Sequence, residues 1–126
     1  MRILIDTHIL IWHLEDDLRL SAEHSDLIED SRNAIYVSVA SMWEIAIKAS
    51  LGKLSLSRSI SEIFAEVDSS ATSLLAIEPI HTIQVSSLPF HHKDPFDRMI
   101  IAQALVEDLS LMSNDVNFVA YGVDLL

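Results

Sequence analysis

Short apolar runs alternate along the chain with longer stretches in which apolar residues recur at helical spacing. The short runs are rich in β-branched residues and are typical of buried strands in a parallel sheet. They predict strands over residues 3–5, 35–39, 74–77 and 109–112, with a last strand over 122–125. The longer stretches predict helices over residues 9–14, 41–51, 80–87 and 94–108, and two more that begin after Ser21 and Ser59.

Strands that alternate with helices predict an α/β fold, in which right-handed crossovers build a parallel sheet covered by helices. No linker, repeat or low-complexity segment interrupts the pattern, so we expect residues 1–126 to form a single domain. In such a sheet the C-termini of the strands and the N-termini of the following helices share one edge. Open α/β proteins bind their ligands at that edge.

Four acidic residues are expected at this edge of the sheet. Asp6 and Asp115 follow strands, whereas Glu44 and Asp97 are expected in the first turns of helices. Clustered carboxylates disfavour one another's ionisation, and their hard oxygen atoms match Mg²⁺ or Mn²⁺. The sequence therefore predicts a divalent-metal site formed by these four residues.

Asp97 has the strongest local argument for a functional role. Asp94 and Pro95 are a natural N-cap and first helical residue, which leaves Asp97 in the first turn. Ile101 and Ala104 lie one and two turns further on, so Asp97 is expected to face inward. A buried carboxylate needs a cation or strong hydrogen-bond donors. Capping alone already explains Asp94.

Each of the other three acids also has a structural explanation. Glu44 lies three residues after Ser41, at capping-box spacing, and four residues before Lys48, at the spacing of a helical ion pair. Asp6 and Asp115 can cap the helical segments that follow them. The metal site is favoured because all four acids are expected at one edge.

Composition and charge narrow the class of protein. With no cysteine, the chain has no disulfide, no thiolate nucleophile and no Cys-ligated metal. No apolar run approaches the roughly 18 residues of a membrane span, and Asp6 interrupts the N-terminal run too early for a signal peptide, so we expect an unexported, cytoplasmic protein. The net charge of −11 argues against a phosphate ligand. Two bound divalent cations would reduce it to −7 and supply local positive charge.

Other candidate contacts have less support. The basic residues that could contact phosphates, although solvated surface explains each of them as well, are Lys48, Lys53, Arg58, Lys93 and Arg98. His91 and His92 are adjacent and are expected to point apart, which disfavours a zinc site. Trp12 and Trp43 could stack on bases, but in apolar helices we expect them to pack in the core.

Four segments together resemble the PIN-domain ribonucleases of the VapC toxin type. The segments are MRILIDTHILIW at 1–12, VSVASMWEIAIK at 37–48, LPFHHKDPFDRMIIAQA at 88–104 and LMSND at 111–115. They occur in the family's order over nearly the whole chain. The Asp-Thr-His opening, Trp-Glu-Ile-Ala and Asp-Pro-Phe-Asp-Arg are together far more specific than any single acid.

The resemblance implies a three-layer α/β/α PIN-like domain with a central parallel sheet. It also implies a Mg²⁺-dependent endoribonuclease, with Mn²⁺ as a substitute, that cuts RNA, is held inactive by a cognate antitoxin and forms a homodimer. The family's catalytic and metal-binding acids fall on Asp6, Glu44, Asp97 and Asp115, the last being the most variable in the family. Ser113 stands where the family commonly has threonine and keeps the hydroxyl.

The residues alone also allow two other functions, one non-enzymatic and one enzymatic. The chain could be a non-enzymatic module whose acids are helix caps and whose acidic surface binds a basic partner. It could also be a metal-dependent phosphatase of small phosphomonoesters. His8 disfavours the haloacid-dehalogenase type of phosphatase, because that family places a second, general-acid aspartate at this position.

Overall fold

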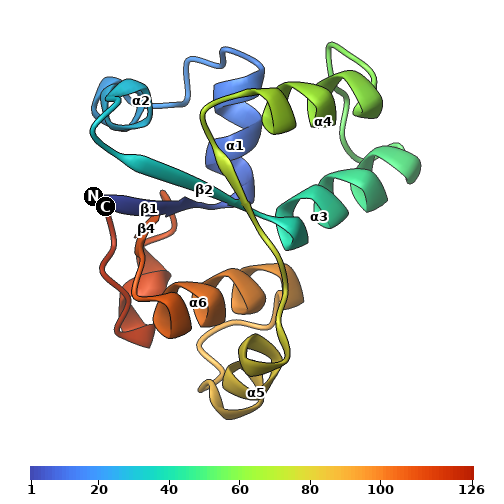
Figure 1. Cartoon of the computed structure of the whole chain (residues 1–126). Coiled ribbons are helices and arrows are strands. Elements are labelled where there is room, and N and C mark those ends of the chain that lie inside the picture. Colours follow the sequence, from blue (N-terminus) through green and yellow to red (C-terminus); the bar gives the residue numbers. More distant parts are fainter.

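A central four-stranded sheet lies between two layers of helices in the computed structural model, which describes residues 1–126 (Figure 1). The strands are β1 (Arg2–Ile5), β2 (Ala34–Ser38), β3 (Ser73–Leu75) and β4 (Ser110–Met112). The helices are α1 (Thr7–Leu14), α2 (Ala22–Glu29), α3 (Val39–Ser50), α4 (Ile60–Ser69), α5 (Pro79–Ser87) and α6 (Pro95–Glu107), followed by the 3₁₀ helix η1 (Val116–Tyr121). The predicted α/β/α fold with a parallel sheet is confirmed.

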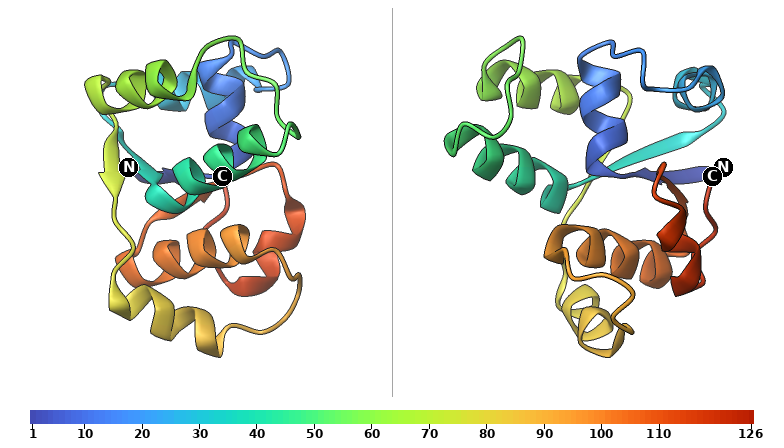
Figure 2. Two further views of the ribbon diagram at one scale, coloured as in Figure 1. Left: turned by 90° about the vertical axis from the view of Figure 1, so that its right-hand side faces the viewer. Right: turned by 180° about the vertical axis from the view of Figure 1, so that it is seen from behind.

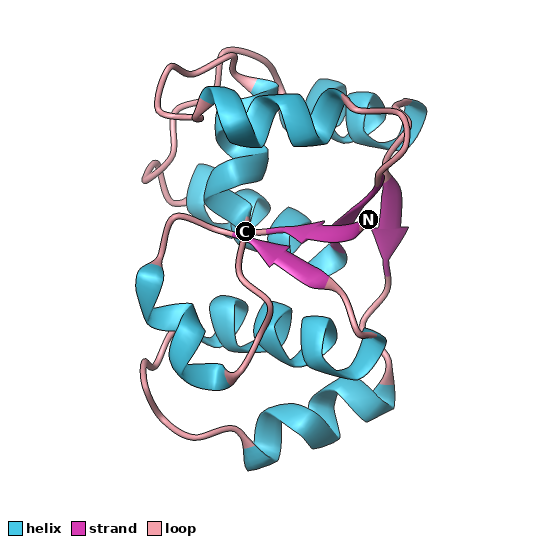
Figure 3. Ribbon diagram, turned by 90° about the vertical axis from the view of Figure 1, so that its left-hand side faces the viewer, coloured by secondary structure: helices cyan, strands magenta, loops and turns pink.

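The sheet has the strand order β3-β2-β1-β4, and all three strand pairs are parallel (Figure 3). The chain winds outward from β1 to β3 and then returns to place β4 on the other side of β1. The direction of winding therefore reverses between β1 and β4. In open α/β sheets, the crevice at the C-terminal ends of the strands at such a reversal is the usual place for a ligand.

Side chains of β1 alternate between two apolar cores, one on each face of the sheet. Ile3 and Ile5 pack in the core on the side of α1 and α4, whereas Leu4 packs in the core on the side of α6 and η1. All three are at most 1% exposed. Figure 2 shows α1, α2 and α4 on one side of the sheet and α5, α6 and η1 on the other. Because both faces are covered, the strand must be apolar throughout, as the sequence pattern indicated.

The junction between β2 and α3 differs from the prediction. Ser38 ends the strand and caps the helix, because its hydroxyl accepts a hydrogen bond from the Ala40 amide at 3.0 Å. α3 therefore begins at Val39, and Ser41 lies inside the helix rather than at its cap. Glu44 is consequently in the second turn of α3 and not in the first.

The predicted last strand over residues 122–125 is wrong. Residues 116–121 form η1, which ends at Gly122 with φ of 78°. Beyond it, only Leu125 forms a β-bridge, to Leu111. A single bridge pairs one residue with the outer edge of β4 and does not form a fifth strand. No helix in the structure combines the length and apolarity needed to cross a membrane.

Candidate metal-ion site

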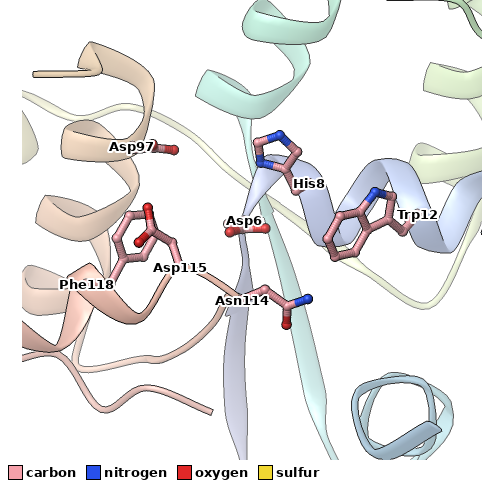
Figure 4. Close-up of a pocket in the computed structure, with 7 residues that line it drawn as sticks. All are labelled: Asp6, His8, Trp12, Asp97, Asn114, Asp115 and Phe118. Carbon is pink, nitrogen blue, oxygen red and sulfur yellow. The ribbon is translucent and has the colours of Figure 1, made fainter. Parts of the chain in front are cut away.

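A cavity of about 290 Å³ lies at the C-terminal edge of the sheet, where the winding reverses between β1 and β4. Three of the predicted acids line it: Asp6 from the end of β1, Asp97 from the first turn of α6 and Asp115 from the loop after β4. Figure 4 shows these three side chains around one space, with Asp97 facing across it toward Asp6. The other lining residues are His8, Trp12, Asn114 and Phe118.

Asp6 is both a helix cap and a member of the acidic site. One of its carboxylate oxygens accepts a hydrogen bond from the Ile9 amide at 2.8 Å, which confirms the capping role. The side chain is buried, and burial raises its pKa, whereas the Ser113 hydroxyl and the Ile9 amide lower it. The charge of Glu44 raises this pKa further. A bound cation would relieve both the desolvation and the repulsion.

Glu44 does not cap α3, since Ser38 holds that position. Its side chain is buried at 3% exposure, and one carboxylate oxygen accepts a hydrogen bond from the Lys48 ammonium group, as the spacing predicted. The other oxygen, Oε1, is buried and has no hydrogen-bond partner. Leaving a buried carboxylate oxygen unsatisfied costs free energy, so this atom requires a partner that the protein does not supply. A metal ion would be such a partner.

Asp97 is half-buried, with 23% of its side chain exposed, and faces the cavity. Burial raises the pKa of its carboxyl group to about 7, together with the negative charges of Asp94, Glu44, Asp6 and Asp115. The charges of the other three predicted acids thus raise the pKa of Asp97, as expected if all four lie near one another. The prediction that Asp97 faces inward is confirmed, and the expected capping by Asp94 is seen in its bonds to the amides of Phe96 and Asp97.

Asp115 lines the same cavity and has a clear structural role as well. Its Oδ1 atom accepts a hydrogen bond from the Asn117 amide at 3.0 Å and so caps η1. Its own amide donates to the Ser113 hydroxyl at 3.0 Å. The cap fixes the direction of the side chain, so capping and a place in the acidic site are compatible.

The donor set fits a hard divalent cation. All four acids offer oxygen atoms, which Mg²⁺ and Mn²⁺ prefer, and Glu44 contributes an oxygen that lacks any partner. In the structure Asp6, Asp97 and Asp115 line the cavity and Glu44 does not, and no three His, Asp or Glu side chains are placed to hold one ion together.

Arg98 is not a phosphate contact, because it is buried at 5% exposure. Its guanidinium group donates to the carbonyls of Pro89 at 2.7 Å and Leu88 at 3.1 Å, and it lies 4.1 Å from the ring centre of Phe90. These contacts pin the loop that precedes α6 to the helix itself. Arg98 therefore fixes the segment from which Asp97 projects.

We expect Arg98→Lys to destabilise the protein by roughly 2–4 kcal/mol, because an ammonium group cannot make the several fixed hydrogen bonds of a guanidinium and would leave buried carbonyls unpaired. Urea unfolding followed by circular dichroism measures the change. Arg32→Lys is the matched control, since Arg32 is exposed and pairs only with Asp30. Equal stabilities for the two variants would contradict the structural role of Arg98.

The other sequence candidates are mostly paired or exposed. Lys48 pairs with Glu44 and Arg58 pairs with Glu66 at 2.7 Å, while Lys53 and Lys93 are exposed. The expected core packing is wrong for Trp43, which is 59% exposed on α3 and packs edge-on against Phe96, with ring centroids 5.3 Å apart.

Sequence reasoning missed several residues of the site. Trp12, which was expected in the core, is half-buried and lines the cavity together with His8 and Asn114. Asn114 is adjacent to Asp115, His8 lies two residues after Asp6, and Trp12 lies one turn beyond His8 on α1. Proximity to the predicted acids was the signal that could have found them.

The fold and the acid-lined cavity define a class of small α/β domains. In this class a cluster of carboxylates lies at the C-terminal edge of the sheet, where the direction of winding reverses. A family model of the PIN domain matches residues 3–123, and the chain belongs to the PIN domain family. PIN domains are nucleases, which supports a hydrolase that acts on nucleic acid. No curated protein sequence matches the chain.

Several solved structures share the fold. One chain of VapBC2 from Rickettsia felis, bound to a DNA fragment from their promoter, has a TM-score of 0.75 at 16% identity, over 100% of this chain and 98% of that chain. FitAcB from Neisseria gonorrhoeae gives 0.70 at 19% identity, over 98% and 96%. A toxin–antitoxin complex from Klebsiella pneumoniae gives 0.60 at 19% identity, over 98% and 95%. At these identities the similarity shows the fold alone.

Proposed function

We propose that this protein is a metal-dependent endoribonuclease and the toxin of a toxin–antitoxin pair. The observation that carries the proposal is the cavity lined by Asp6, Asp97 and Asp115, together with Glu44, whose charge raises the pKa of Asp97 and whose buried Oε1 atom has no partner. The PIN family supports nuclease activity, and the toxin–antitoxin complex among the structural neighbours supports the biological class. A homodimer, which the sequence resemblance implies, is part of the proposal and is testable by light scattering.

Each acid has a role in this proposal. Asp6, Glu44 and Asp97 would hold the principal ion, and Asp115 would orient a water molecule or complete a second site. When bound, Mg²⁺ or Mn²⁺ would lower the pKa of a coordinated water and neutralise phosphate charge. Lys48 holds Glu44 in place from one side and leaves Oε1 for the ion. Attack by water requires no side-chain nucleophile and gives products with a 5′-phosphate and a 3′-hydroxyl.

The substrate class is tested by assaying the purified protein with Mg²⁺ on structured RNA and on a small chromogenic phosphate ester. The proposal predicts cleavage of RNA only, and none in EDTA. Hydrolysis of the ester without cleavage of RNA would instead indicate a phosphatase. Metal binding without activity on either would indicate an interaction module.

The acidic surface near α1 and α2 bears on how such an enzyme is controlled. Part of the charge is neutralised within the chain, because Asp17 pairs with Arg19 and Asp30 pairs with Arg32. Five acids of this surface make no ion pair: Glu15, which accepts hydrogen bonds from Ser57, and Asp16, Glu23, Asp26 and Glu29. Unpaired surface acids increase the rate of association with a basic partner.

We expect the product of the neighbouring reading frame to bind this protein and to suppress cleavage by placing an arginine or lysine at the acidic cavity. An arginine would satisfy the carboxylates with charge-assisted hydrogen bonds in place of the cation. Co-purification, followed by Mg²⁺ titration of the complex, measures this. If inhibition persists after the partner's basic residues near the cavity are neutralised, this mode of control is wrong.

A further inference from the structure

A histidine outside the predicted acid set lies against the site. His92 belongs to the loop between α5 and α6, and its Nε2 atom is 3.7 Å from Oδ2 of Asp97. This nitrogen is buried and has no hydrogen-bond partner. A buried ring nitrogen without a partner is uncommon in proteins and calls for an explanation. The carboxylate of Asp97 lies close to this nitrogen and can accept a hydrogen bond from it.

Tyr121 determines which nitrogen of His92 carries the proton. The tyrosine hydroxyl accepts a hydrogen bond from the His92 backbone amide at 3.0 Å and lies 2.7 Å from His92 Nδ1. These are its only hydrogen bonds in the structure, so its own proton can be satisfied only by donation to Nδ1. An imidazole that accepts at Nδ1 carries its proton at Nε2. The Nε2–H group therefore faces Asp97.

The orientation of the ring is fixed from several sides. His92 packs against the ring of Phe118 with centroids 5.4 Å apart and against Tyr121 at 5.2 Å. Arg98 holds the beginning of the same loop through the carbonyls of Leu88 and Pro89. The backbone amide, the Nδ1 atom and two aromatic neighbours therefore hold the ring in one orientation. The Nε2–H group points toward Asp97 without any rearrangement of the loop.

We infer that His92 is a positioning residue for Asp97: its Nε2–H donates to Oδ2 and turns Oδ1 toward the ion. This inference rests on the proposed function, in which Asp97 holds the metal. Carboxylates that ligate metals are commonly held by such outer hydrogen bonds, and such bonds are often long before the ligand is bound. The two atoms are 3.7 Å apart in the structure, and we expect this distance to shorten to hydrogen-bond length when Asp97 holds an ion.

The first test is the tautomer of His92 in the metal-free protein, read from the ¹⁵N shifts of the imidazole by NMR. The inference predicts a proton on Nε2, and it predicts that Tyr121→Phe weakens this preference. A proton on Nδ1 alone in the wild-type protein would overturn the inference. This measurement needs no metal, no RNA and no variant of His92.

The second test is Mn²⁺ affinity by titration calorimetry. His92→Gln keeps an N–H donor near the position of Nε2 and should bind within about threefold of wild type, whereas His92→Leu should lose roughly 10- to 100-fold. The control is His91→Leu, which removes the neighbouring exposed ring that also packs on Tyr121 and should leave Mn²⁺ binding unchanged.

The outcomes separate this inference from the proposed function. Equal Mn²⁺ affinity for wild type and His92→Leu overturns the role of His92, even if RNA is cut. If the Mn²⁺ affinities of wild type, His92→Gln and His92→Leu follow the expected order but RNA is not cleaved, the role of His92 is supported and the proposed endoribonuclease activity is overturned. Absence of Mn²⁺ binding by the wild-type protein overturns both.

Discussion

Replacing Asp97 by asparagine is expected to reduce Mg²⁺-dependent RNA cleavage by roughly 10³-fold, equivalent to about 4 kcal/mol of transition-state stabilisation supplied by the ion. Asparagine has nearly the same shape but lacks the charge that holds a cation. The fold should persist, because the N-cap of α6 is Asp94 and not Asp97. Initial rates on a defined RNA, with circular dichroism of the same samples, measure both effects.

The same substitution should stabilise the metal-free protein above about pH 5. The pKa of Asp97 is raised from 3.8 to about 7, so the folded state binds a proton more tightly than the unfolded state does. The free energy of unfolding of wild type therefore falls as pH rises through this window and levels off above pH 7. A pKa rise of this size corresponds to roughly 4 kcal/mol; partial exposure reduces it, and we expect a gain of about 1–2 kcal/mol for Asp97→Asn.

Asp108→Asn is the control for both effects, since it makes the same chemical change at the other end of α6. Asp108 has φ of 53°, which asparagine adopts readily, and it does not line the cavity. Urea unfolding in EDTA at several pH values from 5 to 8 should show a pH-dependent gain for Asp97→Asn alone. If a well-folded Asp97→Asn protein cleaved RNA at the wild-type rate, the assignment of Asp97 to the metal site would be wrong.

Glu44→Gln is expected to lower cleavage by at least roughly 100-fold and Mn²⁺ affinity by a similar factor, without loss of stability. Glutamine preserves the helix and the volume of the side chain, but its amide is a poor ligand for a hard cation. The carbonyl oxygen of glutamine can still accept the hydrogen bond from Lys48, and the lost charge of the ion pair is offset by a smaller desolvation cost, so stability should change little. Calorimetric Mn²⁺ titration and thermal unfolding provide the two readouts.

A matched change on α4 gives the comparison for Glu44. Glu62→Gln alters an exposed glutamate beside the cap residue Ser59, where glutamine serves as well as glutamate. It should change neither cleavage nor metal affinity. If Glu44→Gln behaves like Glu62→Gln, then Glu44 only pairs with Lys48 and supports the helix.

The positions of the acids could be predicted from the sequence because they follow from local pattern. The apolar runs of β1 and β4 locate two C-terminal strand ends, and Asp6 and Asp115 stand directly beyond them. The Asp94-Pro95 pair likewise locates the start of α6 and with it Asp97. Parallel pairing then brings these separate segments to one edge, so the site follows from topology without knowledge of any contact.

Details that depend on competing caps or on long-range contacts were not predictable in this way. Ser38 and Ser41 are both suitable caps, and Ser38 is selected because β2 leads directly into α3. Tyr121 meets His92 across 29 positions of sequence, and no local pattern marks that pair. Arg98 resembles a surface cation in sequence, and only the arrangement of the preceding loop shows that it is buried.

The most direct test of the central claim is end-mapped cleavage of total RNA by the purified protein, with Mg²⁺ and with EDTA. A metal-dependent endoribonuclease predicts discrete internal cuts in Mg²⁺ only, with a 5′-phosphate and a 3′-hydroxyl at each new end. Cuts that persist in EDTA, or new ends that carry a 2′,3′-cyclic phosphate, would contradict it, because such products arise from attack by the RNA's own 2′-hydroxyl and not by metal-bound water.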